Sequence, residues 1–566
     1  MIILGISCFY HDSAACIVIN GKVTVAAAEE RFTRIKHDNN FPLKAIDFCL
    51  RWLNLSIADI DRVVFYEKPV IKLERVLTQH LQHFPRSRAI FARSMGSWLG
   101  EKLKIKHILK RSCKYYGKVS FVPHHLSHAA CSYYLSGFTR AVVVTCDGVG
   151  EWATTAVGLG QGTKLELDQE IHFPHSLGLL YSTITAYLGF AVNNDEYKVM
   201  GLAAYGNPTS FRKHFDQLIK MFPDGSFALN MDYFSFDYSD RMPSYKLELL
   251  FGAPTRKPAD KIAARHKNIA AALQEKLEAV VFQLLRSIYQ KYKIKTLCFG
   301  GGVALNSVLN GKISTHTPFT HIFIPPDPGD GGGAIGAALA LAYKNQNKVI
   351  KQSFSAYLGP SFSDEQIEAI LATNRLRYQR LNTHQLIDTV SDLLIRQKII
   401  GWFQGQMEWG PRALGNRSIL ASASQLQMKD IINRKVKHRE LFRPFAPVIL
   451  EEMVNRYFET DVYLSTSAKY MLLVYPFKDN RKNEAPATVH VDGTGRLQTI
   501  ARADNPLYYD LIKMFGKKTG TPIVVNTSFN VRGEPIVCTP QDAVNCFLST
   551  ALDYLVIGSF IVSKYG

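Results

Sequence analysis

The sequence predicts an α/β protein with two domains, and three observations lead to that prediction. The chain has 566 residues, enough for about two to four domains with large cores. Short apolar runs typical of strands end in glycine-rich turns and alternate with helical patterns. A polar stretch at 344–352 follows one helical pattern and is the predicted linker between a first domain, 1–345, and a second, 355–566.

The first predicted elements are two strand–turn–strand units. Ile2–Ser7 and Cys16–Val25 form the first unit. Ala141–Thr145 and Ala153–Gly158 repeat the design around a glycine-containing turn at 148–150. The repetition indicates that the first domain is duplicated.

Two further strands follow in the first domain. Thr296–Phe299 comes after a long helical pattern, Asn268–Tyr292, and ends in the triple-glycine turn 300–302. Ile322–Ile324 leads into a Pro/Gly/Asp turn and then a helix of small residues, Ala334–Ala342. Together with the repeated units, this layout is typical of a duplicated ATPase-type domain of the actin/hexokinase (ASKHA) class. Fold-level analogy places phosphates at the first two turns and adenosine at the third.

The second domain is predicted to be α/β as well. Ser363 begins a helix with Gln366 three residues later, a capping-box pattern. Its predicted strands are Lys398–Phe403, Ile523–Asn526 and Tyr554–Ile557.

Four side chains predict a metal site. His124 and His128 are four residues apart, so one face of a helix presents both imidazoles to a single cation. Asp147 and Asp330 each lie where an apolar run ends in a glycine-rich turn, the place where α/β proteins build sites. This donor set suits iron, manganese or zinc.

Other polar residues at turns are candidates for nucleotide chemistry. His11 and Asp12 occupy the first strand turn, where a histidine would face the γ-phosphate position and act as a general base; the alternative is a histidine that only bonds backbone. Glu196 suits a ribose or a metal-bound water, and Lys198 suits a phosphate. Gly148 belongs to a turn expected to face phosphates.

The second domain contains three cationic and polar clusters. Arginine forks and hydroxyls grouped at strand ends suit phosphate binding, so a common anion site is expected, although any single arginine fits a structural ion pair equally well. The clusters contain Arg412 and Arg417; Lys437 and Arg443; and Ser528 and Asn530.

Charge and composition narrow the class of protein. The net charge is +19, and Arg86–Lys118 carries ten Lys/Arg against one acid, Glu101. That segment is either a solvated basic face or a docking surface for an acidic partner, a lipid head group or RNA. No RNA-recognition signature accompanies it, so nucleic acid is not the expected partner.

No apolar run is long enough to span a membrane, no signal peptide is evident, and the scattered single cysteines predict reduced thiols in a cytoplasmic enzyme.

Taken together, these segments resemble the NodU/TobZ/CmcH-type O-carbamoyltransferases over nearly the whole chain. The most specific stretches are Phe121–Phe138, Pro325–Ala338, Glu408–Ala421, Lys437–Val448 and Thr521–Pro540. The resemblance implies a first domain similar to the Kae/TsaD family, which transfers threonylcarbamoyl groups to tRNA. It implies a second domain similar to YrdC, an α/β domain with a twisted sheet.

The resemblance also implies two half-reactions. In the YrdC-like domain, carbamoyl phosphate yields carbamate, which attacks ATP to form carbamoyl-adenylate and pyrophosphate. The Kae-like domain then moves the carbamoyl group to an acceptor hydroxyl and releases AMP.

Residue roles follow from the same resemblance. His11 would take the acceptor proton, and the metal would bind the quartet described above. The adenylate would lie along Gly301, Gly302, Val303 and Asn306. The phosphates of ATP and carbamoyl phosphate would bind Lys437, Arg443, Ser528 and Asn530, with Arg412 or Arg417 assisting. Fe²⁺ is the expected metal, with Mn²⁺ and Zn²⁺ as alternatives, and Mg²⁺ accompanies ATP.

Several readings compete with this one. A tRNA threonylcarbamoyl-type transferase lacks the fused half-reactions expected here, and a sugar kinase explains neither the metal quartet nor the second domain. A non-catalytic ATP-regulated module leaves the candidate catalytic residues without a role. A metalloprotease requires the His-Glu-x-x-His motif, which this sequence lacks. The acceptor, a hydroxyl-bearing small molecule or glycan, is left open, as is the oligomeric state, with a homodimer among the options.

Overall fold

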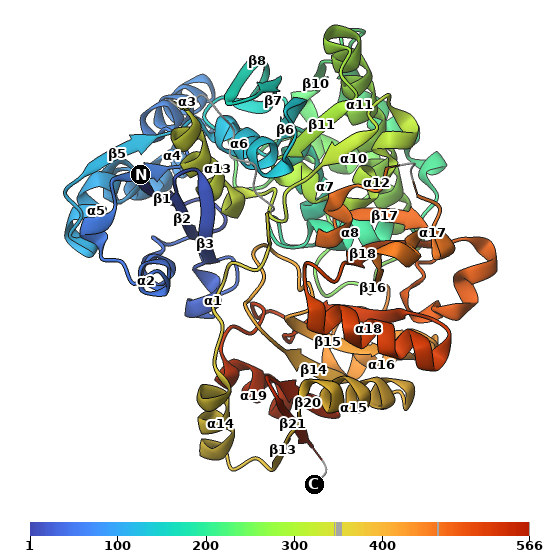
Figure 1. Cartoon of the computed structure of the whole chain (residues 1–566). Helices are drawn as coiled ribbons and strands as arrows, with labels where there is room; N and C mark the ends of the chain where they lie inside the picture. The colour runs from blue at the N-terminus through green and yellow to red at the C-terminus, as the bar shows by residue number, and fades with distance from the viewer. Residues whose placement is uncertain (345, 347–353, 461–462, 565–566) are drawn as a thin grey trace. The chain divides into compact units, whose positions relative to one another are not determined.

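A computed structural model describes residues 1–344, 346, 354–460 and 463–564 of the chain (Figure 1). It divides into two compact units. Unit 1 comprises Met1–Glu29 and Asn39–Phe354, and unit 2 comprises Glu30–Asp38 and Ser355–Gly566. The predicted linker at 344–352 lies largely outside the described residues.

Unit 1 contains two five-stranded sheets with one strand order. In each sheet the first strand is central: it pairs antiparallel with the second and parallel with the fourth. The first sheet has the order β3-β2-β1-β4-β5, from β1 (Ile2–Ser7), β2 (Ala14–Ile19), β3 (Lys22–Ala28), β4 (Arg62–Phe65) and β5 (Lys118–Phe121). The second has the order β12-β11-β6-β7-β8, from β6 (Arg140–Cys146), β7 (Ala153–Gln161), β8 (Lys164–His172), β11 (Thr296–Gly300) and β12 (His321–Phe323). The predicted duplication is therefore confirmed by the strand order.

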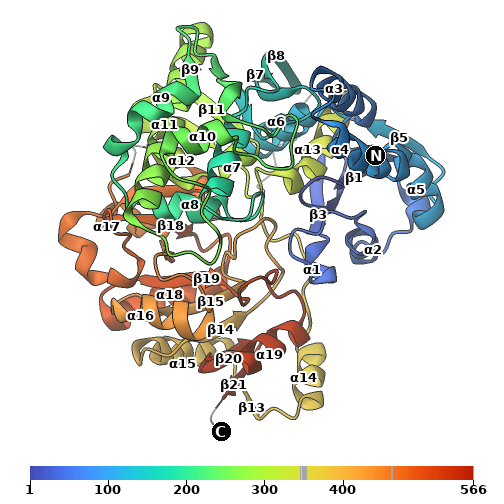
Figure 2. The same ribbon diagram turned by 180° about the vertical axis from the view of Figure 1, so that it is seen from behind.

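The helices of unit 1 connect and cover these sheets (Figure 2). They are α2 (Leu43–Trp52), α3 (Pro69–Gln82), α4 (Arg88–Gly100), α5 (Ile105–Cys113), α6 (His124–Ser136), α7 (Leu177–Tyr187), α8 (Glu196–Ala203), α9 (Arg212–Leu218), α10 (Tyr245–Phe251), α11 (Ala264–Tyr292), α12 (Ser307–His316) and α13 (Asp330–Tyr343). A small hairpin of β9 (Ile219–Met221) and β10 (Phe227–Leu229) stands apart from the large sheets.

Close packing of α13 brings the metal candidates together. A Cβ on Gly336 would lie 1.8 Å from the carbonyl oxygen of Ser127, so a glycine is needed where α13 crosses α6. A Cβ on Gly5 of β1 would lie 2.2 Å from the carbonyl oxygen of Ala334, so α13 also presses against the first sheet. The sequence placed the start of this helix at Ala334, but the helix begins at Asp330, so this boundary was wrong.

Unit 2 is built on a mixed nine-stranded sheet. Its order is β13-β21-β20-β14-β15-β19-β16-β18-β17. The strands are β13 (Tyr378–Arg380), β14 (Ile400–Phe403), β15 (Arg417–Ser422), β16 (Ala446–Leu450), β17 (Leu473–Pro476), β18 (Thr494–Ile500), β19 (Ile523–Ser528), β20 (Tyr554–Ile557) and β21 (Phe560–Ser563). The helices are α14 (Asp364–Thr373), α15 (Thr383–Ile395), α16 (Gln427–Ile431), α17 (Val454–Tyr457), α18 (Pro506–Thr519) and α19 (Pro540–Ser549). The predicted capping box of Ser363 and Gln366 is confirmed at the start of α14.

A short segment from early in the chain belongs to unit 2. It comprises residues 30–38 and begins with α1 (Glu30–Thr33). Arg34 donates to the carbonyl oxygens of Pro535 and Ile536 at 2.9 and 2.7 Å. Phe32 packs on a buried apolar cluster that includes Met407 and Ile536. The strand pattern of the first domain contains no signal of this placement, because the partners lie hundreds of residues away.

Candidate metal centre and anion site

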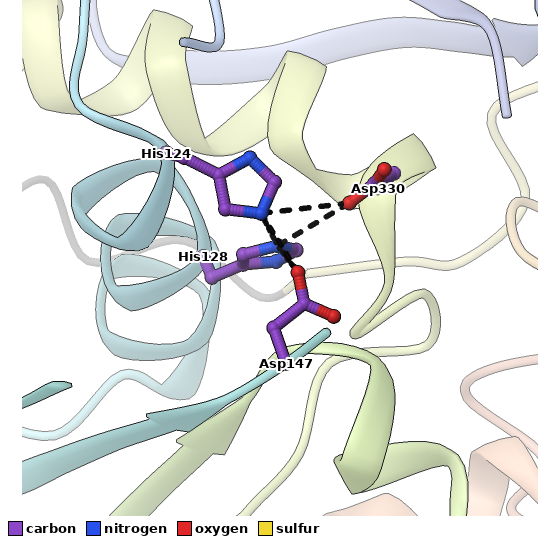
Figure 3. A group of neighbouring side chains, drawn as sticks. All are labelled: His124, His128, Asp147 and Asp330. Carbon is purple, nitrogen blue, oxygen red and sulfur yellow. Dashed lines mark hydrogen bonds and ion pairs between the residues drawn. The ribbon is translucent and has the colours of Figure 1, made fainter. Parts of the chain in front are cut away.

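Two histidines and two aspartates converge in unit 1 (Figure 3). Their ligand atoms all lie within 4.8 Å of one another. His124 Nε2 is 2.7 Å from Asp147 Oδ2, and His128 Nε2 is 3.5 Å from Asp330 Oδ1. The two Nε2 atoms are 3.1 Å apart. The structure thus brings together all four residues that the sequence singled out.

The residues fit a divalent cation. Two imidazole nitrogens and two carboxylate oxygens form a donor set for first-row metals. Asp330 Oδ2 and the Nδ1 atoms of both histidines are buried without a hydrogen-bond partner among the described residues. Buried polar atoms are normally paired, so the unsatisfied carboxylate oxygen indicates a site built for something more than these side chains.

Neighbouring residues orient the histidine helix. Glu151 accepts hydrogen bonds from the backbone N–H of His124 at 3.1 Å and from that of Lys68 at 2.7 Å, so it caps the start of α6 with a negative charge. His125 points the other way and bonds Thr145 Oγ1 and the carbonyl oxygen of Ala153, at 2.7 and 2.8 Å. His125 therefore anchors the helix, and His124 and His128 remain for the site.

The aspartate after β6 joins the quartet to the triple-glycine turn. Asp147 Oδ1 accepts the backbone N–H of Gly302 at 3.0 Å, while its Oδ2 faces the histidines. Gly301 has φ +86°, and a Cβ there would lie 2.2 Å from the carbonyl oxygen of Cys146. Only glycine tolerates both this conformation and this approach, which keeps the turn against the end of β6.

The electrostatics of the quartet favour bound positive charge. Burial disfavours the charged form of His128, but hydrogen bonds and charge from Asp147 and Asp330 outweigh it and raise its pKa to about 10. For Asp147, burial alone would raise the pKa, but hydrogen bonds from His124 and His128 hold it well below its usual range. Two carboxylates around two imidazoles therefore attract a proton or a metal cation.

His11 and Asp12 form a second titrating pair in unit 1. His11 Nδ1 is 2.5 Å from Asp12 Oδ2, and its Nε2 contacts the carbonyl oxygen of Asn193. Burial lowers the pKa of His11, but the bond and charge of Asp12 and the contact with Asn193 raise it to about 10. Both ring nitrogens thus face acceptors and the imidazolium is favoured. Nε2 becomes available to take a proton only when the contact with Asn193 is released.

The remaining candidates of unit 1 have partners of their own. Glu196 accepts from Ser182 Oγ and from the backbone N–H of Asn193, at 2.9 and 2.8 Å. Lys198 forms a buried ion pair with Asp195 at 2.9 Å.

Asn306 bonds to a buried glutamine and caps a helix. Its amide pairs with Gln274, and its side-chain oxygen accepts the N–H of Leu309 at the start of α12. Val303 is buried in the turn after the triple glycine. At Gly148, a Cβ would lie 3.6 Å from the Tyr10 hydroxyl, ordinary contact.

Unit 2 contains a buried lysine. Lys437 is 2% exposed. Its ammonium donates to Ser528 Oγ at 3.3 Å, to Asn530 Oδ1 at 2.8 Å, and to the backbone carbonyl oxygens of both residues. All of these acceptors are neutral. Lys437, Ser528 and Asn530, which the sequence assigned to one anion site, therefore meet.

The charge of Lys437 is poorly compensated. Burial, followed by the positive charge of Arg439, lowers its pKa well below the usual value; Cys546 acts in the opposite direction, and Arg443 adds a smaller lowering effect. Arg443 lies 3.9 Å from Glu440, which also faces Arg532 at 3.8 Å. A buried cation among further cations is a strong site for a polyanion.

Of the two candidate arginines, Arg417 has a role different from that of Lys437. Arg417 is fully buried and donates to four carbonyl oxygens, those of Gln404, Gly405, Asn416 and Pro360. Its guanidinium lies 3.7 Å above the ring of Phe403. These contacts hold the start of β15 and direct the guanidinium of Arg417 to backbone carbonyl oxygens.

Sequence reasoning missed two residues at these sites. Glu151 reaches the first turn of α6 from the turn before β7, and a lone glutamate in a loop carries no signal of that contact. Arg439 lowers the pKa of Lys437 from two residues away, and the sequence analysis gave it no role.

A duplicated α/β unit with a two-histidine, two-aspartate cluster that could hold a metal ion, followed by a second α/β unit with a buried lysine, is the arrangement of an enzyme. Residues 2–339 match the family model for the carbamoyltransferase N-terminus, and residues 391–564 match that for the carbamoyltransferase C-terminus. The chain belongs to the carbamoyltransferase family and is a carbamoyltransferase enzyme.

Relatives match over most of the chain. A protein of Synechocystis sp. is 43% identical, covering 99% of this chain and 96% of its own length. Nodulation protein NolNO of Sinorhizobium fredii is 38% identical, covering 98% of this chain and 79% of its own. Nodulation protein NolO of Bradyrhizobium diazoefficiens is also 38% identical, covering 78% of each chain. The ROK hexokinase structure from Thermus thermophilus is a distant likeness, with 13% identity and a TM-score of 0.29 over 60% of this chain and 98% of that chain.

Proposed function

We propose that this carbamoyltransferase works in two half-reactions, one in each unit. In unit 2, a YrdC-like site hydrolyses carbamoyl phosphate to carbamate and phosphate, and a carbamate oxygen then attacks the α-phosphorus of ATP. Carbamoyl-adenylate forms and pyrophosphate leaves, with Mg²⁺ accompanying the nucleotide. In unit 1, an acceptor hydroxyl attacks the carbamoyl carbon, AMP leaves, and the hydroxyl proton passes to a base. The acceptor is a small molecule or a glycan.

The observation that carries the proposal is the buried lysine of unit 2. Among the described residues, the acceptors within hydrogen-bond distance of Lys437 are neutral, and Arg439 and Arg443 add positive charge. Phosphate groups would compensate all three charges. Carbamate decomposes in water, so a closed cationic site that holds it until adenylation is a chemical necessity of this route.

The quartet of unit 1 supports transfer at a separate site. A divalent cation bound there, Fe²⁺ by preference with Mn²⁺ or Zn²⁺ as alternatives, would polarise the carbamoyl carbonyl as a Lewis acid. Asp147 holds the glycine turn through Gly302, so Gly301, Gly302 and the start of the next turn offer bare backbone to an adenylate. His11 takes the acceptor proton on Nε2 once its contact with Asn193 is released and Nε2 has lost the proton it carries in the imidazolium.

All nine cysteines are free, as expected for a reducing compartment such as the cytoplasm. Among the described residues, no helix is long and apolar enough to cross a bilayer. A homodimer remains one of the assemblies to be measured.

The test is incubation of the full chain with ATP, Mg²⁺ and carbamoyl phosphate in the absence of acceptor, followed by mass spectrometry for carbamoyl-adenylate and pyrophosphate. We expect both products from the wild type and from Asp147→Ala, and neither from Lys437→Met. If Asp147→Ala folds but makes no adenylate, the assignment of adenylation to unit 2 fails. If Lys437→Met makes adenylate at the wild-type rate, the anion site has been placed wrongly.

A further inference from the structure

Helix α3 of unit 1 turns its apolar side outward. Lys72 and Arg75 are buried, whereas Val70 and Leu81 are 73% and 77% exposed. A surface helix normally buries its apolar stripe and exposes its charges. The reversal means that the outer face of α3 offers apolar surface that the protein itself does not use.

The inward side chains of α3 have partners. Lys72 Nζ lies 2.5 Å from Glu67 Oε2, and both side chains are buried. Arg75 donates to Gln79 Oε1 at 2.9 Å, and its guanidinium lies 5.0 Å above the ring of Phe173. Rotating the helix to bury Leu81 would break the buried ion pair of Lys72 and Glu67. The outward direction of the apolar face is therefore fixed by the contacts beneath it.

The apolar surface continues beyond the end of α3 and becomes cationic. Phe84 is 70% exposed, Arg86 and Arg88 are exposed, and Phe91 on α4 is 37% exposed. The ring of His80 lies 5.3 Å from that of Phe91, so the end of α3 and the start of α4 fold against each other. Helices α3 and α4 are neighbours in both views of the chain (Figures 1 and 2). We call Leu81, Phe84, Arg86, Arg88 and Phe91 the tip surface.

Positive charge extends from the tip surface along the chain. Nine of the ten cations of Arg86–Lys118 are exposed, and Lys102 is half-buried. Lys104, Lys106, Lys110 and Arg111 follow on and before α5. Within this segment Glu101 is the single acid, and Arg93 is paired with Asp240. The outer face of this part of unit 1 therefore combines exposed apolar side chains with a large excess of positive charge.

We propose that the tip surface docks unit 1 on an anionic phospholipid bilayer. Leu81 and Phe84 would enter the boundary between head groups and acyl chains, and Arg86 and Arg88 would bind lipid phosphates. The cations around α5 would add long-range attraction to the negative surface. Aliphatic and aromatic side chains rimmed by arginines match a bilayer, whereas single-stranded RNA is bound by stacked aromatic rings without an aliphatic requirement. This docking is separate from carbamoyl transfer.

The test is flotation of the full chain with vesicles of phosphatidylcholine alone or of phosphatidylcholine mixed with phosphatidylglycerol. We expect flotation with the mixed vesicles only, weakening as salt is added. Each cation at an anionic surface is worth about fivefold in affinity, so Arg86→Gln/Arg88→Gln should weaken binding roughly 25-fold. Leu81→Ser/Phe84→Ser should abolish flotation while the adenylation assay is unchanged.

Matched controls come from the same unit. Tyr245 and Leu249 of α10 are also exposed apolar residues, and Lys213 and Lys220 are exposed cations. Tyr245→Ser/Leu249→Ser and Lys213→Gln/Lys220→Gln should float like the wild type. The proposal is overturned if the wild type ignores anionic vesicles, if it binds neutral vesicles equally well, or if the tip-surface variants float normally. Loss of single-stranded RNA binding with unchanged flotation in those variants would overturn it in favour of nucleic acid.

Discussion

Gly302 donates its backbone N–H to Asp147 Oδ1 at 3.0 Å, and this bond ties the glycine turn of unit 1 to the metal quartet. One carboxylate thus serves two purposes. Its Oδ2 faces His124 at 2.7 Å, and its Oδ1 fixes the backbone that the nucleotide is proposed to use. A displaced turn should therefore disturb the quartet as well.

Gly301→Ala tests that coupling. The added Cβ would meet the carbonyl oxygen of Cys146 at 2.2 Å, at a backbone φ of +86°. We expect unit 1 to lose about 2–5 kcal/mol, from left-handed strain of ~1–2 and overpacking of ~1–3 kcal/mol. Metal content should fall in parallel. Gly137→Ala is the matched control, since it has φ +72° and nothing within 4 Å, so only the strain remains. Equal losses in denaturant midpoint for the two variants would argue against a tight turn.

Asp147→Asn should uncouple the two half-reactions. The amide keeps the size of the side chain but removes the negative charge of a proposed metal ligand. Metal affinity and the rate of carbamoyl transfer should therefore each drop by roughly a hundredfold or more. Pyrophosphate release should stay near the wild-type rate. Asp168→Asn, which removes only the surface ion pair with Lys291, is the control. Elemental analysis of the purified proteins measures metal content, and AMP release in the presence of acceptor measures carbamoyl transfer. Full metal occupancy in Asp147→Asn would contradict the assignment of Asp147 as a metal ligand.

Ligand binding at the anion site should take up protons. Burial and the nearby Arg439 and Arg443 hold the pKa of Lys437 below its usual value, and a bound polyanion would raise it again. Between the free and the bound pKa, the ligand therefore binds together with a proton. Titration calorimetry with ATP in buffers of different ionisation enthalpy should detect this uptake in the wild type and not in Lys437→Met. Lys518 forms exposed ion pairs with Asp388 and Asp392, and the control variant Lys518→Met should take up protons as the wild type does. If proton uptake persists in Lys437→Met, another group takes up the proton.

Asp12→Asn should lower the pKa of His11. The raised value, about 10 against 6.5, comes largely from the bond and charge of Asp12, which outweigh burial. A histidine whose pKa is raised in the folded state stabilises the protein fully below pH 6.5, and the contribution disappears as pH rises through about 10. The wild type should thus be more stable than Asp12→Asn at neutral pH, with a difference that shrinks towards pH 10. Urea unfolding midpoints across this range measure it, and a constant difference would show that His11 does not carry the effect.

The segment 30–38 should stabilise unit 2 selectively. Phe32 is partly buried against Met407, Ala413, Ile536 and Cys538, so Phe32→Ala should cost unit 2 about 1–3 kcal/mol, less than a fully buried phenylalanine. Ile35 is 58% exposed in the same segment, and Ile35→Ala is the control. Hydrogen exchange resolved by peptide should accelerate in the strands of unit 2 and leave β1 and β6 unchanged. Faster exchange in unit 1 instead would contradict the assignment.

Much of the first domain could be predicted because its signals are local. Ile2–Ser7 has the predicted bounds, since an apolar run between turn residues has few other options. The histidine pair followed from helical spacing alone, and the two aspartates followed from their positions after strands. The buried lysine and its neutral acceptors were grouped correctly because strand ends collect such residues.

The misses have physical causes. Asp330 begins α13, although the three glycines that follow it, Gly331, Gly332 and Gly333, have low helix propensity. Tight packing outweighs this low propensity, because a Cβ on Gly332 would lie 2.0 Å from the carbonyl oxygen of Asp327. Arg417 was grouped with the phosphate candidates by residue type, but its burial against carbonyl oxygens depends on the fold of the whole unit. The outward apolar face of α3 could not be predicted from the sequence, because it too depends on the fold of a whole unit.

The path of the chain between the units has a consequence for synthesis. Residues 30–38 emerge from the ribosome well before the loop residues that they contact, since Arg31 and Gly410 are 379 residues apart and Arg34 and Ile536 are 502 residues apart. At roughly 5–20 residues per second, this segment waits for about 20–100 seconds before its partners exist. Unit 2 therefore cannot mature until an early part of the chain returns to it. After cleavage at the linker, residues 30–38 would stay covalently continuous with unit 1 at 29–30 and 38–39, and noncovalent contacts would hold them to residues 355–566.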